Sequence, residues 1–294
     1  MKNRPIQALP TILSIAGSDS SAGAGLQADL KTIHALGGYA LTVPTAITAQ
    51  NSLGVAAVYP LAPEIVRLQL ETLFADYQIQ AIKIGMLGNL AILKVVIECL
   101  QQHSEIPIVL DPVLISSSGR PLLETEALPL FINRLLPLAT VVTPNIPETN
   151  ALIQFARPSS PHNAFIGEAD EVPTMGQCLF ALGVKNAVIK GGHSVETEAV
   201  DYLVMPNENS PNHPFIQTYS SIRLETSNTH GTGCTYSSAI ATELAKGKTL
   251  PQAVKEAKDY LFKALENAQT AQPKRLEKEL PGRQERKGGL NHFA

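Results

Sequence analysis

The chain has 294 residues, of which 44% are hydrophobic and 17% charged, and its formal net charge at pH 7 is -3. This composition is sufficient for a large buried core, and it lacks the basic excess of proteins that bind nucleic acids or anionic membrane surfaces. Aromatic residues make up only 5% and tryptophan is absent, so bases would find few stacking partners. No apolar run approaches 18 residues, so no membrane-spanning helix is predicted.

The three cysteines, Cys99, Cys178 and Cys234, lie far apart in the sequence. Their number is odd and their spacing matches no paired metal-ligand motif, so we expect neither a disulfide framework nor a cysteine zinc site. The first residues contain no long apolar stretch followed by a cleavage site, so no secretory signal peptide is predicted. We therefore expect a cytoplasmic location.

Short apolar runs rich in β-branched residues alternate along the chain with longer segments of helical periodicity. The runs predict buried strands of a parallel sheet, at residues 11–16, 81–84, 108–113, 140–143 and 187–190. The longer segments predict helices, at residues 25–36, 63–74, 90–101, 124–136, 174–182, 232–246 and 250–268. Such alternation predicts right-handed βαβ units and hence an α/β fold: a doubly wound, mostly parallel central sheet with helices on both faces, in three layers.

Two segments rich in proline and polar residues, 155–173 and 206–214, are predicted to be surface loops. They flank a strand–helix pair and do not separate two cores, so we expect one domain at residues 11–270. Residues 1–10 are expected to be a flexible N-terminus. Residues 271–294 are charged and glycine-rich, and are expected to form a mobile tail, with residues 289–293 as the exception.

The segment NTHGTGC at residues 228–234 precedes a small-residue helix. Gly231 and Gly233 allow the backbone to approach a ligand closely, and the unpaired N–H groups of a helix N-terminus can hold an anion. The backbone from Gly231 through Thr232 and Gly233 to Cys234 is therefore a candidate anion cradle; the alternative is a tight turn before a well-packed helix. Cys234 lies where a helix dipole can lower a thiol pKa, and it could deprotonate a hydroxyl nucleophile or align it. Its alternative is a small buried hydrophobic residue.

A second glycine-containing turn follows the first predicted strand, in AGSDSSAGAGLQAD at residues 16–29. Its glycine spacing does not match a dinucleotide-binding fingerprint. Ligands of doubly wound sheets bind at the carboxyl ends of the strands, where this turn lies. Asp19 and Asp29 could therefore contact hydroxyl and amino groups of a polar substrate. Their alternatives are a turn residue for Asp19 and a solvated helix face for Asp29.

Polar residues stand at further strand ends. Gln50 follows the strand TAITA, and its amide can both donate to and accept from a heteroaromatic edge. Met86 offers an adaptable apolar wall, and Asp111 offers a carboxylate that could hold Mg²⁺ or its waters. The remaining candidates are Asn145 and Glu148, which could face one metal–phosphate site, and Lys190, which could contact a phosphate.

The ordered set AGSDSSAGAGLQAD, TAITAQNSLGV, IKIGMLG, VLDPVLISSSG, VTPNIPE, KGGH and NTHGTGC resembles the hydroxymethylpyrimidine/phosphomethylpyrimidine kinases of thiamine biosynthesis, which belong to the ribokinase-like superfamily. The resemblance runs from about residue 11 to about residue 268. The segment GLNHF at 289–293 is also similar to the carboxyl-terminal ending of that family. A ribokinase-like fold is the expectation that follows.

The resemblance implies an enzyme that uses ATP and Mg²⁺ to phosphorylate 4-amino-5-hydroxymethyl-2-methylpyrimidine, and then phosphorylates the monophosphate to the diphosphate. Cys234 would replace the aspartate base of related sugar kinases, and the backbone of Gly231, Thr232 and Gly233 would complete an anion hole. The substrate pocket would be formed by Gln50, which binds the polar edge of the pyrimidine, and by Gly17, Asp29, Met86 and Val113. The residues near the ATP phosphates would be Lys190, Asn145 and Asp111, with Glu148 at the metal.

One departure from the family concerns residues 116–119, which contain no lysine, so closure over the phosphates would depend on serine hydroxyls, backbone and Arg120. Two alternatives remain: a pyridoxal-type vitamin B6 kinase, or a non-catalytic relative that binds a pyrimidine. The family also implies a homodimer. A small-molecule substrate is expected, with neither nucleic acid nor membrane as a partner.

Overall fold

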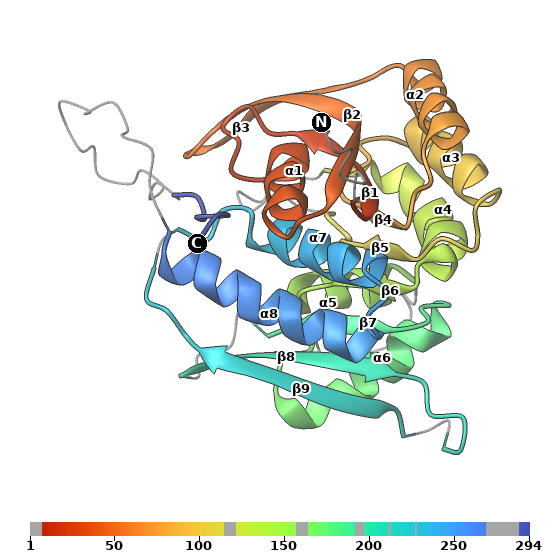
Figure 1. Ribbon diagram of the computed structural model, residues 1–294. Helices are drawn as coiled ribbons and strands as arrows, with labels where there is room; N and C mark the ends of the chain where they lie inside the picture. Colours follow the sequence, from red (N-terminus) through yellow and green to blue (C-terminus); the bar gives the residue numbers. More distant parts are fainter. Residues whose placement is uncertain are drawn as a thin grey trace.

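A nine-stranded sheet forms the centre of the computed structural model, which describes residues 8–114, 122–156, 164–191, 197–210, 213–226, 228–268 and 288–294 (Figure 1). The strand order is β3-β2-β1-β4-β5-β6-β7-β8-β9. The strands span β1 (Thr11–Ser18), β2 (Tyr39–Asn51), β3 (Gly54–Pro60), β4 (Ala81–Ile84), β5 (Ile108–Leu110), β6 (Val141–Val142), β7 (Ala187–Lys190), β8 (Glu198–Met205) and β9 (Phe215–Ile222).

The middle of the sheet, from β2 to β7, is parallel, whereas β3, β8 and β9 pair antiparallel at the two edges. Strands β4 and β5 are buried along their whole length because helices cover both faces, which explains why their sequences are apolar apart from Lys83. The predicted α/β fold with a mostly parallel sheet is confirmed. The three antiparallel strands are additional to the predicted ones.

Helices pack on both faces of the sheet and define two cores. One core contains apolar residues of α2 (Pro63–Asp76), α3 (Leu90–Leu100), α5 (Ile146–Ala156) and α6 (Val172–Ala181). The other contains residues of α1 (Gly25–Ala35), α7 (Thr232–Ala245) and α8 (Leu250–Glu266). This arrangement gives the predicted three layers.

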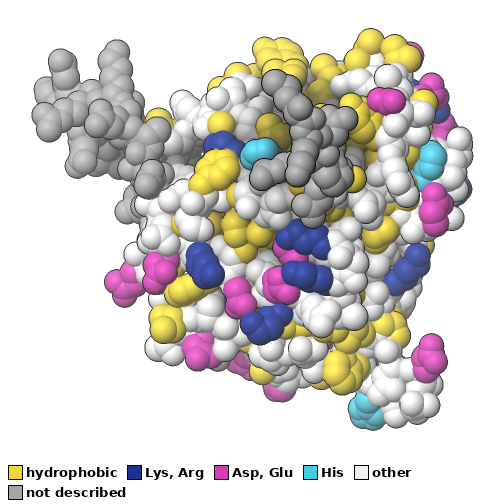
Figure 2. All heavy atoms as spheres, viewed as in Figure 1, with side chains coloured by type: hydrophobic (Ala, Val, Ile, Leu, Met, Phe, Trp, Pro, Cys, Tyr) yellow, Lys and Arg dark blue, Asp and Glu magenta, His cyan; other side chains and the backbone are white. Residues whose placement is uncertain are grey.

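The outer surface of α8 carries paired charges, which are seen among the blue and magenta side chains of Figure 2. Lys255 lies 2.7 Å from Asp259 one turn later, and Lys248 pairs with Glu256. Its inner face buries Ala253, Val254 and Ala257. Such a division between faces is typical of an amphipathic helix on a globular core. In the part of the chain described, no helix combines the length and hydrophobicity needed to cross a bilayer.

The predicted helix at 124–136 is wrong as a continuous element. The chain there forms a 3₁₀ turn (Thr125–Ala127), the short α4 (Leu128–Leu130), a π turn (Phe131–Leu135) and another 3₁₀ turn (Leu136–Leu138). Pro137 has no N–H to donate and its ring clashes with the carbonyl four residues earlier, so the α-helical ladder cannot continue.

The predicted loop at 155–173 is shorter than expected. Helix α5 extends to Ala156, a 3₁₀ turn occupies Ala169–Glu171, and α6 begins at Val172. Residues 157–163 lie outside the described part of the chain. The predicted loop at 206–214 is confirmed, in the residues described, as the connection between β8 and β9.

The carboxyl-terminal residues 288–294 pack beside α8, as Figure 1 shows for the chain end. The N–H of Asn291 donates to the carbonyl of Ala264, and the hydroxyl of Tyr260 donates to the carbonyl of His292. Leu290 and His292 are buried. Residues 289–293, the expected exception within the charged tail, therefore pack against the domain. Of the N-terminal residues expected to be flexible, residues 1–7 lie outside the part of the chain that the structure describes.

Candidate active site

A cavity of about 1050 Å³ opens at the carboxyl ends of the parallel strands. Its wall combines the turn after β1, the end of β2, the loops after β4 and β5, the start of α5, the end of β7 and the start of α7. Of the predicted site residues, all but Asp29 line it: Gly17, Gln50, Met86, Asp111, Val113, Asn145, Glu148, Lys190, Gly231, Thr232, Gly233 and Cys234. Such strand-end cavities are the usual ligand sites of doubly wound folds.

The start of α7 is a glycine-dependent turn. Gly231 is the N-cap and has φ +85°, a conformation that residues with a side chain rarely adopt. A Cβ added there would lie 1.8 Å from the carbonyl oxygen of Gly23. At Gly233 it would lie 3.3 Å from Nζ of Lys190 and 3.4 Å from Oδ2 of Asp111. Close packing therefore brings the first helical turn, whose N–H groups have no partner within the helix, beside a charged cluster.

That cluster joins the buried Asp111, which follows β5, with two partly buried side chains, Lys190 at the end of β7 and Glu148 in the first turn of α5. Nζ of Lys190 lies 2.9 Å from Oδ1 of Asp111 and 3.9 Å from Oε2 of Glu148. Thr143 donates a further hydrogen bond to Asp111. Burial alone would lower the pKa of Lys190, but Asp111 and Glu148 together raise it above its ordinary value, so the lysine remains a cation.

For Glu148, in contrast, the effect of burial on the pKa outweighs that of the neighbouring lysine. Burial raises its pKa to about 7, Asp111 adds to the shift, and Lys190 opposes it. Two carboxylates thus compete for one lysine at the cavity wall. A cation brought in by a nucleotide would relieve this competition, which is how Mg²⁺ is commonly held: by one or two carboxylates and substrate phosphates. The donor set of Asp111 and Glu148 therefore fits Mg²⁺. Among the described residues, no group of three or more His, Cys, Asp or Glu side chains could hold a metal ion by itself.

Asn145 and Glu148 also begin α5. The N–H of Glu148 donates to Oδ1 of Asn145 at 2.8 Å, and the N–H of Asn145 donates to Oε2 of Glu148 at 2.8 Å. This reciprocal pair is a capping box, with Asn145 in the position of the N-cap. The segment read as a strand end with polar groups is therefore a helix start. The cap fixes the Glu148 carboxylate at the cavity wall.

The opposite wall offers apolar and amide groups. A Cβ on Gly17 would lie 3.0 Å from Sδ of Met86, so the absence of a side chain there makes room for the methionine. Thr45 donates to the carbonyl of Met86 at 2.6 Å and fixes that loop. Gln50 lies at the end of β2, with Nε2 3.1 Å from Nε2 of His230.

Asp19 and His230 connect the two glycine-containing turns. Oδ2 of Asp19 lies 2.9 Å from Nε2 of His230, and its carboxylate also accepts from the N–H groups of Ser21, Gly23 and Ala24. Burial alone would raise the pKa of Asp19, but the hydrogen bonds from His230, Ser21 and the backbone lower it to about 2. Asp19 is thus an ionised anchor of its own turn. Sequence reasoning considered it for substrate contact, and it did not single out His230 within NTHGTGC.

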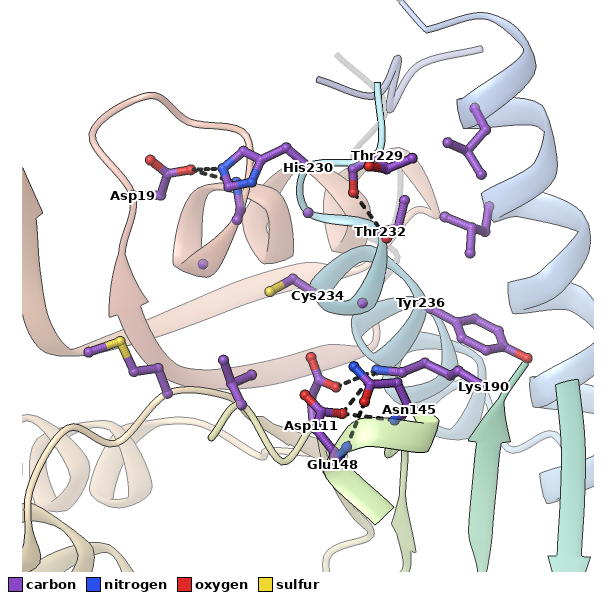
Figure 3. A pocket seen from close by; sticks show the side chains of 18 of the residues that line it. Asp19, Asp111, Asn145, Glu148, Lys190, Thr229, His230, Thr232, Cys234 and Tyr236 are labelled. Carbon is purple, nitrogen blue, oxygen red and sulfur yellow. Dashed lines mark hydrogen bonds and ion pairs between the residues drawn. The ribbon is translucent and has the colours of Figure 1, made fainter. Parts of the chain in front are cut away.

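Cys234 lies between the Asp19–His230 pair and the Lys190–Asp111–Glu148 cluster (Figure 3). The N–H of Gly25, at the start of α1, contributes a hydrogen bond to the thiol. Burial nevertheless raises the pKa of Cys234 to about 11, and the opposing effects of Lys83 and Gly25 are smaller. The prediction of a lowered thiol pKa is therefore wrong, because desolvation outweighs the helix N-terminus.

Asp29 does not line the cavity, so its predicted place in the pocket wall is wrong. Its side chain is fully buried and bonded to Lys83, Ser14 and Ser238. Helical periodicity placed Asp29 on α1 but could not tell which neighbours its face meets.

Sequence reasoning also missed four charged residues that line the cavity: Lys83, Asp201, Arg223 and Lys258. Lys258 of α8 lies 2.7 Å from Asp201 of β8, and the N–H of Gly191 donates to Asp201. The available signal for Lys83 was a lysine inside the otherwise apolar strand AIKI. The loop at 116–119, Arg120 and the His193 of KGGH lie outside the described residues.

Comparison with known proteins agrees with this geometry. The family model described as phosphomethylpyrimidine kinase matches residues 19–277. The hydroxymethylpyrimidine/phosphomethylpyrimidine kinase of Haemophilus influenzae is 41% identical over 257 residues, which cover 86% of this chain and 90% of the relative.

Two solved structures are also similar. The phosphomethylpyrimidine kinase of Clostridium difficile has a TM-score of 0.71 and 40% identity, covering 86% of this chain and 98% of its own. An ADP complex of Bacillus subtilis pyridoxal kinase has a TM-score of 0.79 and 30% identity, covering 97% and 98%. The ribokinase-like fold expected from the resemblance is confirmed. The chain is a phosphotransferase that belongs to the phosphomethylpyrimidine kinase family.

Proposed function

We propose that this protein transfers the γ-phosphoryl group of ATP to the hydroxymethyl group of 4-amino-5-hydroxymethyl-2-methylpyrimidine, and then phosphorylates the monophosphate, in thiamine biosynthesis. The observation that carries the proposal is the position of Cys234. Cys234 lines the same cavity as the amide of Gln50 and the apolar side chain of Met86, and the Lys190–Asp111–Glu148 cluster lines it as well. The curated relatives support the pyrimidine substrate, and the ADP complex of the similar pyridoxal kinase supports ATP as donor.

On the substrate side, the amide of Gln50 would bind the polar edge of the ring, while Gly17, Met86 and Val113 would contact its flat face and methyl group. Each of these residues lies at a strand end, so the sheet fixes their mutual positions. Positioning of this kind supplies a large share of the rate in phosphoryl transfer, because the protein performs little covalent chemistry itself.

On the nucleotide side, Lys190 would contact a phosphate as a point charge, and the backbone N–H groups from Gly231 to Cys234 would stabilise the charge of the moving phosphoryl group. Asp111 and Glu148 would hold Mg²⁺, which neutralises phosphate charge when bound, and Asn145 would keep Glu148 in place. Cys234 would accept the hydroxyl proton, which requires its thiolate form.

The direct test is to incubate the protein with ATP, Mg²⁺ and hydroxymethylpyrimidine and to resolve the products by mass. Monophosphate followed by diphosphate is expected. Monophosphate alone would confine the protein to the first step, and absence of both products, with pyrimidine binding retained, would favour a non-catalytic relative.

A vitamin B6 kinase is the second candidate, because pyridoxal kinases of Bacillus subtilis and Staphylococcus aureus share this fold at about 30% identity. Pyridoxal carries the same kind of hydroxymethyl group on a flat methylated ring. Comparing kcat/KM for pyridoxal and hydroxymethylpyrimidine in the same preparation separates the two, and we expect the pyrimidine to be preferred.

The expected homodimer is also proposed, on the basis of exposed apolar side chains at the β2–β3 edge. Ile47 is 47% exposed and Tyr59 is 65% exposed, and they are directly paired across the two strands. Light scattering during size-exclusion chromatography would test it: a dimer mass is expected, and Tyr59→Lys should shift the mass toward a monomer.

A further inference from the structure

A fully buried polar cluster lies next to Cys234 and has no part in the mechanism described so far. Nζ of Lys83, on β4, lies 2.9 Å from the Asp29 carboxylate, on α1. The same carboxylate accepts from the hydroxyl of Ser14 at 2.6 Å and from that of Ser238 at 2.8 Å. All four side chains are 0% exposed. Four separate elements therefore meet at one ion pair.

The cluster is joined to the thiol through the two helices that begin at the site. Gly25 in the first turn of α1 contacts the sulfur of Cys234 in the first turn of α7. One turn later in each helix, Asp29 of α1 accepts the hydrogen bond from Ser238 of α7. Since residues four apart lie on the same helix face, the Gly25–Cys234 and Asp29–Ser238 contacts are successive layers of one helix interface.

Lys83 occupies the side of the cluster that meets the cavity. Lys83 and Cys234 both line the cavity, whereas Asp29 does not. A Cβ on Gly85 would lie 2.8 Å from Nζ, so this glycine leaves room for the ammonium group. The ammonium group has three N–H donors, and it binds Asp29, a residue that does not line the cavity.

Stability alone is a poor explanation for this pair. Strand β4 has the sequence AIKI, and the other three residues are buried apolar side chains. Replacing a buried ion pair by apolar residues of similar volume is often neutral or stabilising, because desolvating two charges is costly. A lysine in the middle of the apolar core is therefore better explained by what it does for the adjacent cavity.

We propose that Lys83 is a positioning residue for the proton acceptor: held by Asp29, its ammonium group stabilises the thiolate of Cys234. The inference rests on the proposed function, in which that thiolate takes the proton of the substrate hydroxyl. The hydroxyl oxygen then bonds to the γ-phosphorus, the bond to the bridging oxygen of ADP breaks, and the thiol later returns the proton to solvent.

The charges around the thiol predict opposite effects on the amount of Cys234 thiolate for substitutions of Asp29 and of Lys83. Lys83 lowers the pKa of Cys234, whereas Asp29 from α1 and Asp111 from the end of β5 raise it. Lys190 from β7 is a second cation whose charge interacts with this sulfur. Removing Asp29 should therefore favour the thiolate, and additional removal of Lys83 should reverse that effect.

The test is the rate of Cys234 alkylation by iodoacetamide at pH 8, measured by peptide mass spectrometry without ATP or pyrimidine. Asp29→Asn is compared with the double variant Asp29→Asn/Lys83→Met. The double variant is used because Lys83→Met alone would leave the Asp29 carboxylate buried without its partner, which threatens folding. Cys178 on α6, in the same digest, serves as an internal control for an unchanged fold.

We expect Cys234 to react at least about threefold faster in Asp29→Asn than in the double variant, since tenfold more thiolate is partly offset by its lower nucleophilicity. Equal rates, with equal Cys178 rates, would overturn the proposal. The readout is separate from turnover: if the rates differ but Cys234→Ala retains activity, the role of Lys83 at the thiol stands and the proposed proton acceptor fails.

Discussion

Nε2 of His230 lies 2.9 Å from Oδ2 of Asp19, a contact between residues 211 positions apart in the sequence. It joins the turn after β1 to the turn before α7. Gln50 contacts the same nitrogen of His230. The proton on this nitrogen is donated to the ionised Asp19, so the nitrogen cannot also accept from the Gln50 amide. The Gln50 amide therefore contacts His230 without a hydrogen bond of its own, which leaves its N–H groups for a ligand.

His230→Ala is expected to raise the KM for the pyrimidine more than the KM for ATP, because Gln50 and the Asp19 turn lose their common partner. The KM for the pyrimidine should rise about tenfold, which corresponds to the loss of one charge-assisted hydrogen bond. Steady-state kinetics with each substrate varied in turn measure it. Equal effects on both KM values would contradict a role at the pyrimidine wall.

Gly231→Ala is expected to reduce kcat by at least about 10²-fold, because both the φ of +85° and the nearby Gly23 carbonyl exclude a side chain. Gly247→Ala is the matched control, since Gly247 has φ +81° and no atom within 4 Å of the added Cβ. The control should lose about 1 kcal/mol of stability and keep its activity. Similar losses of activity in both variants would show that backbone strain alone is responsible.

The pKa of about 7 for Glu148 predicts an acidic limb in the pH dependence of activity. Below pH 7 the carboxyl becomes neutral and can no longer hold a metal ion, so kcat/KM for ATP should fall with decreasing pH. Glu148→Gln should be less active and should lack this limb, although Gln still supports the capping box. Rates between pH 5.5 and 8.5 test this, and an unchanged limb in the variant would assign it to another group.

Stability should change with pH in the opposite direction. Because the pKa of Glu148 is raised above its unfolded value of 4.5, its contribution to stability is fully present below pH 4.5 and is lost as the pH rises through 7. Glu148→Gln should therefore be more stable than the wild type at pH 8, by on the order of 2 kcal/mol, and similar to it at pH 4.5. Urea unfolding at the two pH values measures the difference.

The ordered end of the chain should support the start of α7. Nε2 of His292 lies 3.2 Å from the hydroxyl of Thr235, the residue after Cys234. Burial lowers the pKa of His292 to about 4 from 6.5, so its contribution to stability is present above pH 6.5 and is lost as the pH falls through 4. His292→Asn should lower the Tm at pH 7.5 and reduce the difference in Tm between pH 7.5 and pH 5. An unchanged Tm at both pH values would contradict this role.

The parallel strands could be predicted because burial on both faces produces continuous apolar runs, as in IVL of β5. Strands β8 and β9 are partly exposed and pair with each other and with β7, so polar residues interrupt their apolar pattern: Glu198 and Asp201 in β8, and uncharged polar residues in β9. The start of α5 was read as a strand end because it directly follows the apolar run at 140–143, and because Asn145 and Pro147 favour turns as well as helix N-termini.

The residues of the candidate site that lie at strand ends could be predicted from the sequence. Gln50, Asp111 and Lys190 follow strands whose order along the chain places them at one edge. The sequence could not assign Asp29, because its position depends on how α1 packs against α7. Lys83 was missed for a related reason, since its ion pair joins residues 54 positions apart.

Turnover of Cys234→Ala tests the central claim most directly. If the thiol accepts the proton of the substrate hydroxyl, kcat for phosphorylation of hydroxymethylpyrimidine should fall by about 10²–10⁴-fold. ATP affinity, measured by calorimetry, should stay within a few-fold of the wild type, because Lys190, Asp111 and Glu148 are unchanged. Near-normal turnover in this variant would contradict the assignment of Cys234.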